Sequence, residues 1–139
     1  MQQAAATLDL HHVQQQPGSP FQDFTGTIGA TTNARWKYSG SLAYDRELFQ
    51  VGLRWRHTAA FRDASVVTNP ASTIAGPGSV NYVDLFGRLH VGEKLEMRVG
   101  VTNIGDVEPE QVGSLRGFTS PAIYDVIGRA YYAGFKVNL

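Results

Sequence analysis

The final segment of the chain constrains its fold more than any other feature. From residue 131 to residue 139, apolar residues occupy every second position, and they are Tyr131, Ala133, Phe135, Val137 and Leu139. A period of two places such a set on one face of a β-strand. A strand with an unbroken apolar face needs an apolar cover, which is either lipid or a protein core.

Five further segments alternate in the same way. We predict six strands, at about residues 5–13, 35–45, 48–59, 81–91, 95–105 and 129–139. All six prolines lie outside these segments, as expected because proline cannot donate a hydrogen bond to a β-ladder. No segment carries an apolar stripe with helical spacing, so the chain is predicted to be all-β.

The connections between the predicted strands alternate in length. Residues 46–47 and 92–94 form short turns, whereas residues 14–34, 60–80 and 106–128 form long loops. This pattern predicts an antiparallel up-and-down meander with every long loop at one end, as in transmembrane barrels. The three-residue turn also predicts the register of its two strands, with Leu89 opposite Met97 and His90 opposite Glu96.

Composition excludes several classes of protein. Lysine plus arginine and aspartate plus glutamate each number 12, so the net charge is zero and gives no electrostatic argument for a nucleic-acid partner. The absence of cysteine excludes disulfides and thiolate metal sites. No apolar run is long enough for a transmembrane helix.

Alternating strands also fit a soluble β-sandwich, but the distribution of side chains favours a membrane barrel over it. Aromatic residues cluster where the apolar faces end: Trp36, Tyr38, Trp55 and Tyr131 near the long loops, and Tyr44 and Phe49 near the short turns. The opposite face is charged and is predicted to line a wet lumen, with Arg54, Arg56, Asp84, Arg88, Glu96 and Arg98. The long loops contain few apolar residues and are expected to be solvated. Together these features favour a membrane barrel.

Several motifs resemble one family. Arg35-Trp36-Lys37-Tyr38, the run from Val51 to Arg56, the run from Val99 to Asp106, and the run from Tyr124 to Arg129 before the last strand are similar to the C-terminal end of TonB-dependent outer-membrane receptors. The resemblance covers about three quarters of the chain. Gly105 stands where the family usually has Phe, and Pro109 follows as it does there.

The resemblance implies a location in the outer membrane of a Gram-negative bacterium. The family's barrel has about 22 strands and a plugged lumen, so six strands would be a C-terminal fragment without the plug domain. The implied partners are outer-membrane lipid, the missing plug and barrel strands, the TonB complex through the missing N-terminal region, and the barrel-assembly machinery. That machinery reads residues 131–139, although the family usually ends in an aromatic residue rather than Leu139.

The function implied is TonB-dependent uptake of a scarce nutrient, such as an iron chelate or an oligosaccharide, without catalysis. The alternatives are a passive outer-membrane porin and a soluble carbohydrate-binding β-sandwich module. The ligand contacts expected in the long loops are Arg62, Asp63, Glu108, Glu110 and Arg116. The lumen arginines either attract an anionic ligand or pair with Asp84, Glu96 and plug carboxylates.

No catalytic, cofactor or metal site is predicted. His11, His12, His57 and His90 lack a convincing ligand spacing on one face, and no nucleophile motif frames the serines. Asp106 and Asp125 flank the last long loop and are expected to shape its turns.

Overall fold

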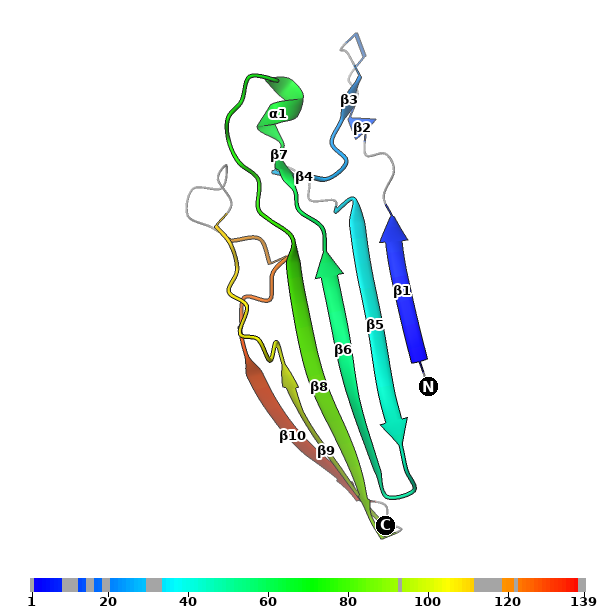
Figure 1. The fold of residues 1–139 in the computed structure, drawn as a ribbon. Coiled ribbons are helices and arrows are strands. Elements are labelled where there is room, and N and C mark those ends of the chain that lie inside the picture. Colours follow the sequence, from blue (N-terminus) through cyan, green and yellow to red (C-terminus); the bar gives the residue numbers. More distant parts are fainter. Residues whose placement is uncertain are drawn as a thin grey trace.

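A single antiparallel sheet dominates the fold. The computed structural model describes residues 2–8, 13–14, 17–18, 21–29, 34–92, 94–111, 119–121 and 123–137. The sheet contains β1 (Gln2–Leu8), β5 (Trp36–Asp45), β6 (Phe49–Thr58), β8 (Val80–Val91), β9 (Leu95–Thr102) and β10 (Ala130–Val137), in that order. Each strand of this sheet pairs with the strand of the same sheet that follows it in the sequence, so the predicted all-β meander of six strands is confirmed. Figure 1 shows the long connections at one end of the sheet and the short turns at the other.

The predicted bounds are close for every strand except the first. β1 begins at Gln2 rather than near residue 5, because β5 offers it partners from Leu42 back to Trp36. Val13 was expected to end the same strand, but it lies in β2 (Val13–Gln14), which pairs with β3 (Gln22–Asp23). Residues 9–12, which were expected to continue the first strand, lie outside the described residues.

The register confirms the predicted pairing across the second short turn. Leu89 lies opposite Met97, and His90 lies opposite Glu96. Across all six strands, paired residues lie on the same face of the sheet, so the two faces continue from each strand to its neighbour. One row of apolar partners therefore runs unbroken through five strands, from Leu42 through Leu53, Leu85 and Val101 to Tyr131.

The buried core lies at the long-loop end, which corrects the expectation that the loops are simply solvated. Ile28, Phe61 and Tyr124 come from the three long connections and are at most 5% exposed. They form one cluster with Ala34, Val80, Tyr82 and Ile123. Each long loop contributes only one or two apolar side chains to this core, and these residues have no periodic spacing in the sequence. The core forms because the loops meet at one end of the sheet.

Short elements organise this loop core. β4 (Thr27–Ile28) and β7 (Arg62–Asp63) pair in parallel, which ties the first long loop to the second. The single helical turn α1 (Ser65–Thr68) follows β7. Val80 and Tyr82 belong to β8, so the loop core extends over the end of the sheet. Both lie on the same face of β8 as Asp84.

Candidate functional surfaces

One face of the sheet, here called the apolar face, is apolar and exposed from edge to edge. Val51, Leu53 and Val99 in its middle are 42%, 43% and 51% exposed. Its other exposed large side chains are Leu8, Trp36, Tyr38, Leu42, Tyr44, Phe49, Trp55, Leu85, Leu89, Val91, Met97, Tyr131, Phe135 and Val137. Continuous apolar surface of this extent marks contact with a membrane or a partner, because soluble monomers rarely leave it open to water.

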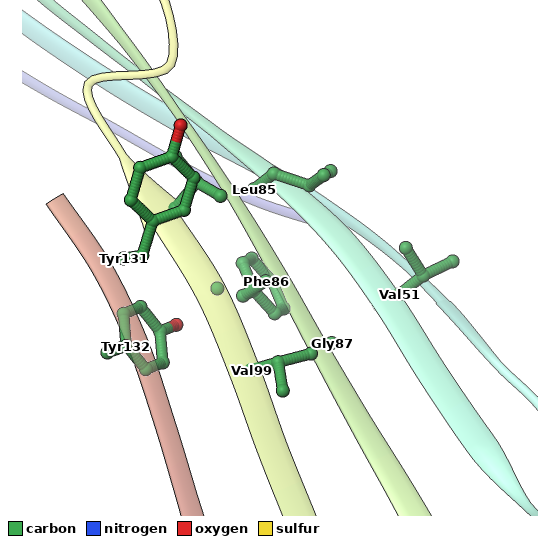
Figure 2. Close-up of a pocket in the computed structure, with 9 residues that line it drawn as sticks. Val51, Leu85, Phe86, Gly87, Val99, Tyr131 and Tyr132 are labelled. Carbon is green, nitrogen blue, oxygen red and sulfur yellow. The ribbon is translucent and has the colours of Figure 1, made fainter. Parts of the chain in front are cut away.

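A shallow hollow interrupts the apolar face where a glycine replaces a side chain. Gly87 lies between Val51 on β6 and Val99 on β9 in the register. The hollow has a volume of about 340 Å³. Figure 2 shows these residues together with Leu85 and Tyr131. The side chains that line it from the apolar face are hydrocarbon or aromatic, so it suits an acyl chain better than a polar ligand.

The opposite face, here called the polar face, carries the residues predicted to line a lumen. Arg54, Arg56, Asp84, Arg88, Glu96 and Arg98 all lie on it by register. Arg88 and Arg98 lie directly opposite each other, and the Glu96 carboxylate offsets their repulsion at N–O distances of 3.6 and 2.5 Å. His90 Nε2 lies 3.3 Å from the same carboxylate. The structure thus forms the expected pairing with Glu96, while the lumen itself stays a prediction.

Asp84 is the centre of the second charged group on the polar face, and it is only 8% exposed. The Arg56 guanidinium donates to both carboxylate oxygens, at 3.1 and 3.0 Å. The backbone N–H of Asn103 donates to Oδ1 at 3.0 Å. Arg56 also lies 5.1 Å from the ring centre of Tyr82, whose hydroxyl accepts from the backbone N–H of Asp125 at 3.0 Å. This group joins three strands to the last long loop.

Asn103 is a residue that the sequence analysis missed. It is fully buried and adopts a left-handed conformation, with φ of 50°, at the end of β9. Its side chain donates to the carbonyl of Val107 and accepts from the N–H of the same residue. An asparagine that ends an alternating strand is a recognisable turn signal, because asparagine tolerates this conformation better than most residues.

We expect Asp84→Ala to loosen the last long loop from the sheet. The substitution leaves Arg56 and the N–H of Asn103 without their acceptor, and hydrogen bonds to charged groups contribute about 1.5–3 kcal/mol each. Because Arg56 is partly exposed to solvent, we expect a total loss of about 2–3 kcal/mol. Limited proteolysis between residues 106 and 128 and thermal unfolding would measure it.

Arg54→Gln is the matched control for this prediction. Arg54 lies opposite Asp84 in the register, yet no described residue forms an ion pair or hydrogen bond with its guanidinium. Its loss should therefore change stability by less than about 0.5 kcal/mol. Equal protease sensitivity of the two variants would contradict the central role of Asp84.

Aromatic rings cover glycines on the polar face. The ring of Phe86 lies over Gly52, and the ring of Tyr132 lies over Gly100, each on the neighbouring strand. A Cβ atom at either glycine would come within 2.5 Å of the ring. Such glycine–aromatic pairs fix the register of neighbouring strands, since any larger residue would displace the ring.

The predicted ligand contacts in the loops differ in their surroundings. Arg62 and Glu108 are exposed, as a ligand contact requires. Glu110 is exposed too, but its carboxylate accepts from the backbone N–H of Gly78 at 2.8 Å and so joins two loops. Arg116 lies outside the described residues.

Asp63 does not fit the role of a surface ligand contact and is a correction. It is 1% exposed, and its Oδ1 accepts from the backbone N–H of Ser65 at the start of α1. It lies in β7, where it pairs with Ile28 of β4, so it is buried among the loops and is not on their outer surface. Asp106 and Asp125 do shape the turns, because they accept from the backbone N–H groups of Arg129 and Ile127.

The loop core shifts the pKa of Tyr124. Burial first, and then the Glu110 carboxylate and Tyr82, raise the pKa of Tyr124 to about 12. Its phenol is therefore neutral at physiological pH. Its hydroxyl has no hydrogen-bond partner among the described residues.

The histidines form no cluster in the described part of the chain. His57 lies on the apolar face beside Asn81, and His90 lies on the polar face beside Glu96, while His11 and His12 lie outside the described residues. Among the described residues, no group of three or more His, Asp or Glu side chains could hold a metal ion. No helix in the described ranges has the length and hydropathy needed to cross a membrane.

Comparisons with known proteins leave the chain without an assigned family. No family model, curated protein or solved structure matches it.

Proposed function

We propose that this chain is the C-terminal part of a TonB-dependent outer-membrane receptor that takes up a scarce nutrient. The observation that carries the proposal is the apolar face, which is exposed across all six strands and lies opposite a charged face. A lipid bilayer covers such a surface without any further protein. The charged face is then left to line the interior, as in wide membrane barrels.

The ends of the apolar face support the same proposal. Trp36 and Tyr38 stack at the long-loop end, and Tyr44 and Phe49 contact each other at the short-turn end. Amphipathic rings at both limits of an apolar band are typical of proteins that cross a membrane, because the rings prefer the interface with water. In this orientation the three long loops project to the outside, where they would capture the ligand.

The sequence motifs from Arg35 onwards support the receptor class rather than a passive porin. In the proposed mechanism, the loops bind an iron chelate or an oligosaccharide, and a plug domain moves when TonB transmits energy from the proton gradient. The remaining barrel strands pair with the edges that β1 and β10 leave in the described sheet. No step of this mechanism requires a catalytic residue.

Expression of the isolated chain tests the membrane part of the proposal. We expect it to collect in inclusion bodies and to require detergent, because two strand edges and a broad apolar face promote aggregation. A soluble monomer with a cooperative thermal transition would instead identify a β-sandwich module. Uptake by cells with and without TonB, using the complete reading frame, would then separate a receptor from a porin.

A further inference from the structure

A group of aromatic and polar side chains lies at the long-loop end of the apolar face. It consists of Trp36 and Tyr38 on β5, Trp55 and His57 on β6, and Asn81 on β8, and is called the girdle site below. Tyr38, His57 and Asn81 are direct partners in the register. We propose that the girdle site binds a sugar ring in the headgroup of a membrane glycolipid, an inference that rests on the proposed membrane location.

The rings of the girdle site lie next to one another, and their larger members are accessible. Trp36 and Tyr38 are 6.1 Å apart between ring centres and only 11° from parallel. The ring of His57 lies 5.7 Å from that of Tyr38 at an angle of 32°, and 5.9 Å from that of Trp55 at an angle of 30°. All three larger aromatic side chains are 37–40% exposed. The C–H face of a pyranose ring is apolar, so it can pack on an exposed aromatic ring of this group.

Hydrogen bonds within the girdle site leave one donor group and one acceptor for a ligand. The indole N–H of Trp55 donates to Oδ1 of Asn81 at 3.1 Å. Nδ1 of His57 lies 2.9 Å from the same oxygen, so Nδ1 must carry the hydrogen. In the neutral imidazole, Nε2 is then an acceptor. The amide NH₂ of Asn81 offers its hydrogens to no described residue.

This donor and acceptor suit hydroxyl groups, because each hydroxyl of a sugar both donates and accepts. A phosphate could accept from the Asn81 amide, but a fully ionised phosphate has no hydrogen to donate to an acceptor nitrogen. An acyl chain could use neither group. The combination of exposed rings with a free donor and a free acceptor therefore points to a sugar.

The surroundings of the girdle site favour a sugar that is attached to lipid. Toward the middle of the sheet the site continues into the apolar row of Leu42, Leu53 and Leu85, which suits acyl chains. Gly40 adds open space beside Trp55, since a Cβ atom there would meet no atom within 4 Å. At the short-turn end, Tyr44 and Phe49 form a tilted ring pair with centres 6.2 Å apart, and the Arg46 guanidinium donates to the Tyr44 hydroxyl and lies over its ring. The imidazole and amide beside the rings thus distinguish the long-loop end.

Titration of glycolipid into nanodiscs tests the proposal. The protein from the complete reading frame is placed in phosphatidylethanolamine–phosphatidylglycerol nanodiscs, and lipid A with its core sugars is the probe. We expect Asn81→Ala and Trp55→Leu each to weaken binding about tenfold, which corresponds to about 1.4 kcal/mol. The paired control variants Tyr44→Leu and Phe49→Leu should retain the affinity of the unmodified protein. Heat-modifiable electrophoretic mobility would show that each variant is folded.

A second variant covers the case in which Trp55→Leu fails to fold. Gly40→Val introduces a residue that strands favour, meets no neighbouring atom at its Cβ, and narrows the space beside Trp55. It should fold normally and also weaken binding. Binding by Asn81→Ala and Gly40→Val that equals that of the unmodified protein would overturn the proposal. So would equally tight binding of the free core oligosaccharide, which would identify a soluble-sugar site.

Failure of the proposed function would look different. In that case the unmodified protein would not enter nanodiscs or show heat-modifiable mobility at all. Normal insertion combined with unchanged glycolipid binding in the variants would reject the girdle site alone.

Discussion

Val99→Arg should prevent the complete protein from inserting into the outer membrane, whereas Gly134→Arg should leave insertion intact. Val99 lies on the apolar face, is 51% exposed, and pairs with Gly87 on one side and Ala133 on the other. An arginine on the lipid face near the bilayer midplane costs about 2–4 kcal/mol. Membrane yield and heat-modifiable mobility would measure the difference.

Gly134 is the better control because of its place in the structure. It lies on the polar face opposite Arg98, and a Cβ atom there would meet no atom within 4 Å. Gly100 also lies on the polar face, but a side chain there would collide with the ring of Tyr132. An arginine at Gly100 would therefore disturb packing for reasons unrelated to lipid. If Val99→Arg and Gly134→Arg insert equally well, the apolar face does not meet lipid.

The sheet could be predicted because its information is local. Alternation assigns each residue of a strand to one face of the sheet. The number of residues in a short turn then decides which residues of the next strand lie on that face. The turn of residues 92–94 was therefore enough to place Leu89 opposite Met97. The same reasoning placed Arg56 and Asp84 on the charged face, where they pair.

The loop core could not be predicted in this way, because its residues have no periodic spacing. Ile28, Phe61 and Tyr124 are far apart in the sequence, and they come from three different loops. Only their common position at one end of the sheet brings them together. Asp63 shows the consequence for function: a charged loop residue suggests a ligand contact, yet the core buries it.

The start of β1 was missed for a related reason. Leu8 and Leu10 suggested a strand centred near residue 9, whereas Gln2 and Gln3 carry no apolar signal. The structure nevertheless pairs Gln2 with Leu42, because the edge of β5 remains available there. Backbone pairing does not depend on side-chain polarity, so an edge strand can extend beyond its apolar pattern.

Deletion of residues 131–139 should abolish insertion of the complete protein into the outer membrane. β10 pairs with β9 from Ala130 to Val137, so its loss exposes the edge of β9. Unpaired backbone groups cost several kcal/mol each in a bilayer, where no water replaces the lost partner. The deletion also removes the apolar series Tyr131, Ala133, Phe135 and Val137, which is proposed to be read by the assembly machinery.

A substitution separates the two consequences of this deletion. Leu139 lies outside the described residues, and Leu139→Phe gives this position the aromatic residue that the resembling family usually has in its last strand, while the described pairing of β10 with β9 is retained. It should preserve or increase the membrane yield, because it changes the assembly signal and not the strand. Cell fractionation and heat-modifiable mobility of both variants provide the measurement. If the truncated protein inserts with the mobility of the unmodified protein, β10 is not the closing strand. The apolar face would then need a cover other than a closed barrel in lipid, such as the second sheet of a sandwich.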